Sequence, residues 1–310
     1  MIKRGCVVLS VLGIDAAWTF HQPSGVALVA KSGTDTWRCL CVAPSYGSFV
    51  RYGAGHPVDW RRPKGSGESP DVPRLVTAAN RILNGNPVTI ITVDMPVSRD
   101  SITGRREADN AVSRAFGAAG CGTHNPSVQR PGKLGHELTV AFQDAGYLVA
   151  TTDDNPGTPN RLLEVYPHPA LLRLLTEEYR LAYKAGKSSK YWPGTSIPKR
   201  IRNLLDIYRR ILAGLAKEIT DVNIPLPDAE DCRSLSALKS YEDGIDALVC
   251  AWVGCRYLAG RATPFGNSAA AIWIPATLAT FSNSMAANTP PTETRNNLSH
   301  LRMDTYPKSS

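Results

Sequence analysis

The apolar positions near the start of the chain predict three consecutive strands. Residues 6–14 are almost all apolar, which is typical of a strand that is covered on both faces. Two further apolar segments, 25–30 and 36–42, follow after short connections. Connections of this length favour antiparallel pairing, because parallel strands need a longer crossover. We therefore expect an antiparallel meander whose first strand delivers Asp15 at its end.

Strands and helices alternate along the rest of the chain. Residues 72–83 repeat apolar positions with a helical period, and the β-branched segment 88–93 predicts a buried strand that ends at Asp94. The remaining predicted elements are helices over 105–119 and 134–145, strands over 147–151 and 161–166, and helices over 167–175, 198–217 and 241–258. This order is typical of an α/β fold in which helices pack on a mixed sheet.

Composition along the chain predicts one domain with two insertions and a tail. We assign residues 1–265 to the domain, with a loop insertion over 44–71 that is rich in Gly, Pro and Ser. A helical insertion is expected around 176–235. Residues 266–310 are expected to form an extended or disordered tail, because polar residues and proline dominate towards its end.

The overall composition narrows the class of protein. Hydrophobic residues make up 43% and charged residues 20% of the chain, which excludes a disordered protein or a coiled coil. The net charge of +8 suits a polyanionic partner such as nucleic acid. No apolar run reaches the roughly 18 residues of a membrane-spanning helix, so no membrane partner is expected. The seven cysteines lack Cys-x-x-Cys spacing, which favours reduced thiols in a cytoplasmic protein over a zinc ribbon.

Carboxylates stand at the ends of several predicted elements. Asp15, Asp94 and Glu164 lie at or near the ends of apolar strands, whereas Asp243 and Asp246 are three residues apart on one face of a helix. Carboxylates beside apolar runs are costly unless they are paired, solvated in a cleft or bound to cations. Ligands bind at strand ends in open α/β sheets, and hard oxygen ligands suit Mg²⁺ or Mn²⁺. The alternative is that these acids cap helices and satisfy turn amides.

Five short motifs surround the candidate residues: GIDAA (13–17), TVDMP (92–96), RREAD (105–109), LEVYPHPAL (163–171) and EDGIDALVCA (242–251). In this order they resemble the motifs of the family of proteins of unknown function numbered 429, which is described as predicted nucleases of the RNase H-like fold. The resemblance covers about residues 6–262. It implies an RNase H-like mixed sheet of five strands, an antiparallel meander followed by parallel strands, flanked by helices.

The same resemblance implies a divalent metal site that cleaves phosphodiester bonds. Asp15, Asp94, Glu164 and Asp246 would be catalytic and would bind Mg²⁺ or Mn²⁺, with Asp243 as a further metal ligand. Two such ions about 4 Å apart can activate water and stabilise the leaving oxygen. The expected function is therefore a metal-dependent nuclease that acts on DNA or RNA.

Basic residues and one histidine are candidates for contacts with the substrate. Arg105 and Arg106 follow Asp94 and would grip a phosphate, unless Arg106 forms a surface pair with Asp109. Lys199 and Arg202 lie on the basic face of the helix over 198–217, which suits a phosphate backbone or simply faces solvent. His168 would shuttle a proton, although its flanking prolines favour a structural turn.

Two other functions remain open. A catalytically silent nucleic-acid-binding protein would keep the fold and fits the basic charge equally well. A phosphotransferase of the actin and sugar-kinase type would need a small, donor-rich hairpin after the first aspartate, whereas residues 16–20 read Ala-Ala-Trp-Thr-Phe. Such an enzyme would also need two copies of the fold, whereas the pattern of predicted strands and helices contains one copy.

Overall fold

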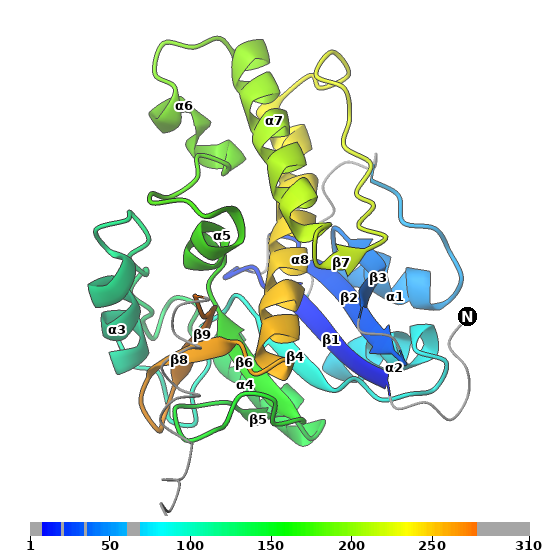
Figure 1. Ribbon diagram of the computed structural model, residues 1–310, viewed down its shortest axis with the longest axis vertical. Coiled ribbons are helices and arrows are strands. Elements are labelled where there is room, and N and C mark those ends of the chain that lie inside the picture. Colours follow the sequence, from blue (N-terminus) through cyan, green and yellow to red (C-terminus); the bar gives the residue numbers. More distant parts are fainter. Residues whose placement is uncertain (1–7, 20–21, 34–35, 61–68, 278–310) are drawn as a thin grey trace, which may run out of the picture. The chain divides into compact units, whose positions relative to one another are not determined.

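The computed structural model describes residues 8–19, 22–33, 36–60 and 69–277. Met1–Ala276 forms one compact unit, and Thr277–Ser310 forms a second of which Thr277 is described. Within the described residues the first unit contains a mixed sheet of nine strands with helices packed on it (Figure 1). No helix in these ranges combines the length and the apolar character needed to cross a membrane.

The centre of the sheet contains the predicted meander and the predicted parallel strands. Strands β1 (Val8–Asp15), β2 (Gly25–Ser32) and β3 (Trp37–Ala43) pair antiparallel, and Cys6 of the expected first strand lies outside the described residues. Strand β4 (Ile90–Val93) pairs parallel with β1, and β6 (Arg161–Val165) pairs parallel with β4. The central order is therefore β3-β2-β1-β4-β6.

The sheet contains more than the five strands that were expected. Strand β7 (Ile219–Thr220) extends the sheet beside β3, and β5 (Leu148–Val149) pairs with β6. On the other side of β6 lie β9 (Ala271–Pro275), which is parallel to it, and β8 (Ala262–Gly266), which is antiparallel to β9. The tail predicted from residue 266 is thus wrong up to Pro275, because β9 is completely buried in the sheet. Residues 278–310 of that tail lie outside the described residues.

Helix α8 (Lys239–Leu258) lies directly on β1 and β2. Glycines allow this close approach: a Cβ atom on Gly13 would stand 2.4 Å from the carbonyl oxygen of Ala247, and one on Gly25 would stand 2.0 Å from that of Asp243. Helix α7 (Ile197–Leu215) packs against α8 (Figure 1). Because α8 is enclosed in this way, its buried residues surround the helix instead of forming one stripe.

The other helices build a core on each face of the sheet. They are α1 (Tyr46–Gly53), α2 (Val72–Ile82), α3 (Glu107–Phe116), α4 (Lys133–Asp144) and α5 (Pro167–Leu175). Helices α3, α5 and α7 share one core with α8, and α1, α2 and α4 form the other. The shorter helical segments are η1 (Ala185–Lys187), α6 (Ser188–Tyr191) and η2 (Leu235–Leu238).

Helix α1 corrects the prediction of a loop over 44–71. The Ser45 side chain accepts a hydrogen bond from the backbone N–H of Ser48 at 3.1 Å and thereby caps the helix. Phe49 is completely buried and anchors the helix in the core beneath it. The glycines and serines of this segment favour a loop in the sequence pattern, although part of it folds as a short amphipathic helix. Residues 61–68 of the predicted loop lie outside the described residues.

Candidate functional site

The candidate site lies where β1, β4 and β6 end beside the start of α8. The strands are in register, so that Val93 faces Ile14 on one side and Glu164 on the other. The described residues enclose two neighbouring cavities of about 650 and 510 Å³ at these ends. Both cavities are lined by Trp18, Gln22, Asp94, His124, Lys184 and Lys239. The register of the sheet thus brings the predicted strand-end acids to one place.

Asp15 and Asp94 are adjacent and face the cavities. The backbone N–H of Asp94 donates to the carbonyl oxygen of Ile14 at 2.9 Å, which holds the two strand ends together. Both side chains are partly exposed to the cavity that they line. Within the described part of the chain, no group donates a hydrogen bond to either carboxylate. Their oxygens are therefore available to a ligand.

Burial and neighbouring negative charges affect the protonation of this pair. Burial raises the pKa of Asp15 to about 7, against the opposing effect of the Lys184 ammonium group. The pKa of Asp94 is raised well above its usual value, first by burial and then by the negative charge of Asp15. A cation between the two carboxylates would remove this repulsion, which is the usual reason for such acids to bind a metal.

Asp246 joins the same electrostatic group but is enclosed by protein. Its side chain is completely buried, and Oδ1 accepts a hydrogen bond from the Tyr183 hydroxyl at 2.8 Å. The other oxygen, Oδ2, pairs with the Nζ atom of Lys184. Burial raises the pKa of Asp246 to about 6 despite that lysine. Asp246 lines neither of the two cavities formed by the described residues, so it holds Lys184 in place.

Two lysines neutralise the acids at the start of α8. Lys239 Nζ lies 2.8 Å from Glu242 Oε1 and also pairs with Asp243 Oδ1. Lys184 Nζ lies 3.5 Å from the same Glu242 oxygen, whose partner Oε2 accepts from the backbone N–H of Ala185 at 2.7 Å. The Oδ2 atom of Asp243 is buried and has no hydrogen-bond partner among the described residues. Asp243 lines the smaller cavity, so it is the third carboxylate beside Asp15 and Asp94, although its Oδ2 atom is itself buried.

The sequence reasoning missed Lys184, Lys239 and Glu242. The spacing of Lys239 to Glu242 and Asp243, three and four residues, is that of ion pairs on a helix and would have revealed one of the lysines. Lys184 precedes η1 in a segment without periodicity, and its partner Asp246 is 62 residues away. That pairing exists only in the folded chain.

Glu164 is held by a buried arginine. Arg106 Nη1 lies 2.6 Å from Oε2 and Nη2 lies 2.7 Å from Oε1, and the backbone N–H of Val97 donates to Oε2 at 2.9 Å. Arg106 also donates to both oxygens of Asp109 and to the Val97 carbonyl oxygen. All five of its N–H donors are therefore used within the protein. The alternative of an Arg106–Asp109 pair is confirmed, but the pair is buried and not at the surface.

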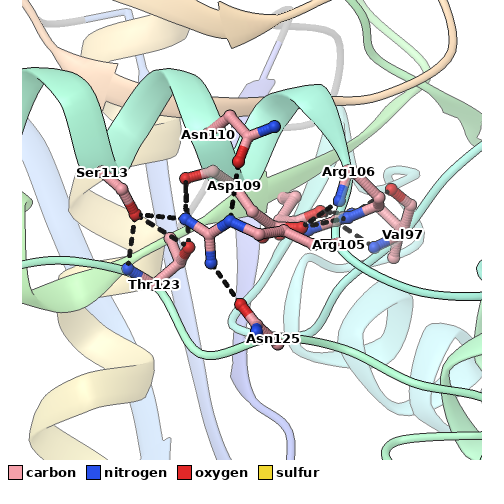
Figure 2. A network of polar contacts seen from close by, with 9 residues as sticks. Val97, Arg105, Arg106, Asp109, Asn110, Ser113, Thr123 and Asn125 are labelled. Carbon is pink, nitrogen blue, oxygen red and sulfur yellow. Dashed lines mark hydrogen bonds and ion pairs between the residues drawn. The ribbon is translucent and has the colours of Figure 1, made fainter.

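Arg105 fastens helix α3 to the loop that carries His124 and Asn125 (Figure 2). Its guanidinium group donates to the Asn110 side chain at 2.7 Å, to the Ser113 hydroxyl at 2.7 Å and to the Asp109 carbonyl oxygen at 3.0 Å, and it also contacts Asn125. Arg105 itself lines neither cavity in the described structure. Its contacts fix the loop whose residues do line them.

The remaining candidates lie in two different places. His168 is buried in the wall of the larger cavity, where its Nε2 atom contacts Arg180, and burial lowers its pKa well below the usual value. This histidine is therefore neutral at physiological pH. Lys199 and Arg202 are exposed on α7, and neither lines the cavities that the described residues form.

The donor set can be compared with the needs of a metal ion. Among the residues that the structure describes, no three His, Cys, Asp or Glu side chains form a group arranged to hold a metal. Mg²⁺ keeps several of its waters and is commonly bound through one or two carboxylates plus the phosphates of a substrate. The two carboxylates of Asp15 and Asp94 fit that smaller requirement.

Comparison with known proteins identifies the family. No curated protein and no solved structure matches the chain. A family model described as "Protein of unknown function (DUF429)" matches residues 13–270, from within β1 to the turn before β9. This match covers most of the chain, including every acidic residue of the candidate site, and the chain therefore belongs to the DUF429 family.

Proposed function

We propose that the protein is a divalent-metal-dependent nuclease in which Asp15 and Asp94 hold the cation. One observation carries the proposal: two adjacent strand ends present carboxylates to a cavity, and no described residue donates a hydrogen bond to them. Their raised pKa values reflect burial and repulsion by neighbouring carboxylates, Asp243 for Asp15 and Asp15 for Asp94, which a cation would relieve. Mg²⁺ and Mn²⁺ match oxygen ligands of this kind.

The arrangement of the sheet supports the same proposal. The centre of the sheet has the order β3-β2-β1-β4-β6, and its three antiparallel strands followed by two parallel ones agree with the arrangement that the resemblance to RNase H-like nucleases implies. In that fold the first and fourth strands present the acids, and here they present Asp15 and Asp94. We therefore assign the centre of the sheet to the RNase H-like fold, with β5, β7, β8 and β9 as additions.

The ligand set is smaller than the sequence predicted. Asp15 and Asp94 would bind the cation directly, and Asp243 would lie beside them with Oδ1 paired to Lys239 and Oδ2 buried. Glu164 and Asp246 would act as positioning residues, because their oxygens are already bonded to Arg106, Tyr183 and Lys184. When bound, a divalent cation supplies a Lewis acid that polarises the phosphodiester group.

Positive groups of the chain would hold the substrate beside these carboxylates. Lys184 lines both cavities and is kept in position by Asp246 and Glu242. Its ammonium group is charged, since the surrounding carboxylates raise its pKa even though burial opposes this. Lys184 can therefore donate to a phosphate oxygen, and the net charge of +8 favours the approach of a polyanion.

The proposal is tested with purified protein, Mn²⁺ and a panel of single-stranded, duplex, hybrid and junction substrates of DNA and RNA. We expect cleavage that chelation abolishes and that Asp15→Asn and Asp94→Asn each lower by about 100-fold or more, as expected for loss of a group that stabilises the transition state. Asp100→Asn removes an exposed carboxylate on the neighbouring loop and should leave the rate unchanged. Cleavage that survives in both site variants would contradict the proposal.

A second candidate function has one observation in its favour. Lys184 and Lys239 already neutralise Asp246, Glu242 and Asp243, as expected of a site that has lost its metal and retained the fold. Such a protein would bind nucleic acid without cleaving it, and a chelator would not change the affinity. Electron paramagnetic resonance of Mn²⁺ separates the two functions: the nuclease binds Mn²⁺ through Asp94, and Asp94→Asn abolishes that binding.

A further inference from the structure

One wall of the larger cavity is cationic and lacks acidic partners. His124, Arg180 and Lys187 line this cavity together with Asp94. Lys184 and Lys239 line it as well, but carboxylates of α8 neutralise both of them. No carboxylate in the described segments forms an ion pair with Arg180 or Lys187. The cavity thus combines carboxylates with Arg180 and Lys187, two cations that form no ion pair with a described residue, and with the imidazole of His124.

Arg180 is held in this wall with donors to spare. Its backbone N–H donates to the carbonyl oxygen of Ala119 at 2.9 Å, and its Nη2 atom contacts Nε2 of the neutral, buried His168. Its Nε atom is buried without a hydrogen-bond partner in the described structure. A guanidinium group presents its donors as a planar fork that matches phosphate oxygens. A neutral imidazole leaves the positive charge of Arg180 unbalanced.

The basic groups of the wall lower one another's pKa values. Burial lowers the pKa of Lys187, and the charges of Arg180 and Lys184 lower it further, against the opposing effect of Glu242. Burial likewise lowers the pKa of His124, with Lys187 and Arg180 as the next causes. An anion bound among these groups would reverse the repulsion, so the wall is suited to a ligand with more than one negative charge.

We propose that His124, Arg180 and Lys187 form a subsite for a phosphate monoester. A monoester carries close to two negative charges near neutral pH and offers three acceptor oxygens to these donors. The cavity of about 650 Å³ has the size of a small-molecule pocket, and Trp18 and Tyr166 add aromatic surface on which a base can stack. The ligand is therefore a single nucleotide unit with a free phosphate.

The position of the subsite gives it a role in the proposed reaction. The phosphate would lie in the same cavity as Asp94, so that the phosphodiester next to a phosphorylated end would reach the carboxylates. This extension, to a nuclease that recognises a phosphorylated strand end, rests on the proposed function. The phosphate-binding subsite does not depend on it, because none of its three residues belongs to the proposed metal ligands.

The binding of adenosine 5′-monophosphate is measured by calorimetry in the presence of a chelator. We expect Arg180→Gln and Lys187→Gln each to weaken binding about tenfold or more, as for the loss of a charged hydrogen bond. Adenosine lacks the phosphate. Its affinity for the wild type should therefore be no higher than the affinity of the nucleotide for these variants. Arg81→Gln and Lys217→Gln remove exposed cations elsewhere and serve as matched controls. Circular dichroism confirms the fold of each variant, and Arg180→Lys should retain part of the affinity.

Equal binding of the nucleotide to wild type, Arg180→Gln and Lys187→Gln would overturn the proposal, as would no binding to the wild type.

Decamers with a 5′-phosphate, a 3′-phosphate or hydroxyl ends identify the source of the phosphate. Preference for a phosphorylated decamer assigns the subsite to strand ends, and binding of the mononucleotide alone assigns it to a free nucleotide. Nucleotide binding without Mn²⁺-dependent cleavage would refute the nuclease and retain the subsite. Cleavage that Arg180→Gln and end phosphates leave unchanged would refute the recognition of strand ends and retain the nuclease.

Discussion

Glu164 and Asp94 stand on neighbouring strands at the same edge of the sheet, yet their surroundings are opposite. Glu164 accepts two hydrogen bonds from Arg106 and one from the backbone of Val97. Asp94 faces a cavity and accepts no hydrogen bond from any described residue. An acid at a strand end is therefore not in itself a ligand position. The folded chain decides its role by supplying or withholding donors.

The largest effect is expected from removing the partner of Glu164. Arg106→Met leaves the carboxylates of Glu164 and Asp109 buried without their cation, which should lower the free energy of unfolding by about 3–5 kcal/mol. Urea unfolding monitored by circular dichroism measures the change. Arg114→Met, which removes an exposed arginine that pairs with Glu107, is the control and should cost less than about 1 kcal/mol. Equal losses in the two variants would show that burial of the Glu164 pair does not matter.

An intermediate effect on stability is expected from replacing an unpaired acid, and it has the opposite sign because the replacement stabilises the protein. The pKa of Asp15 is about 7 in the folded protein, whereas an unfolded aspartate titrates near pH 4. Between these values the folded protein holds a proton that the unfolded chain has lost, so its stability falls as the pH rises. The slope is at most about 1.4 kcal/mol per pH unit for one proton, and it ends above pH 7. Asp15→Asn should reduce this slope and stabilise the protein at pH 8.

The slope is measured by urea unfolding between pH 5 and pH 8 in a chelator. Asp100→Asn, which alters an exposed acid, should keep the wild-type slope. Mg²⁺ should raise the stability of the wild type at pH 8 more than that of Asp15→Asn, because binding to the folded state alone stabilises it. A wild-type slope in Asp15→Asn would mean that this carboxylate does not carry the extra proton.

The smallest effect on the free energy of unfolding is expected from changing Arg105, which directly precedes Arg106 in the sequence. Arg105→Ala removes hydrogen bonds that join α3 to the loop over 121–125, but the side chain is exposed (Figure 2). We expect a loss of about 1 kcal/mol in the free energy of unfolding. Hydrogen exchange should accelerate in this loop while the sheet is unaffected. A loss as large as that of Arg106→Met would show that neighbouring arginines of this motif share one role.

Local patterns predicted the elements that carry the site. The β-branched run before Asp94 and the apolar run before Asp15 predicted β4 and β1 with their acidic ends, and the meander and the long helices were confirmed. The same patterns failed for α1 and β9. Helix α1 lies in a segment whose glycines and serines favour a loop, and β9 is a short strand within the segment predicted as the tail. Both are stabilised by packing against distant parts of the chain.

The sequence alone determined where the strands end and which of those ends bear a carboxylate, because apolar runs and turn residues act over a few neighbouring positions. Only the tertiary structure decided which carboxylates stay free. Arg106 reaches Glu164 across 58 residues, and Lys184 reaches Asp246 across 62. Such pairings depend on the register of the sheet and on how closely α8 approaches it, and neither property is visible in the local pattern. The sequence gives the charge of each side chain, but the tertiary structure determines which group pairs with it.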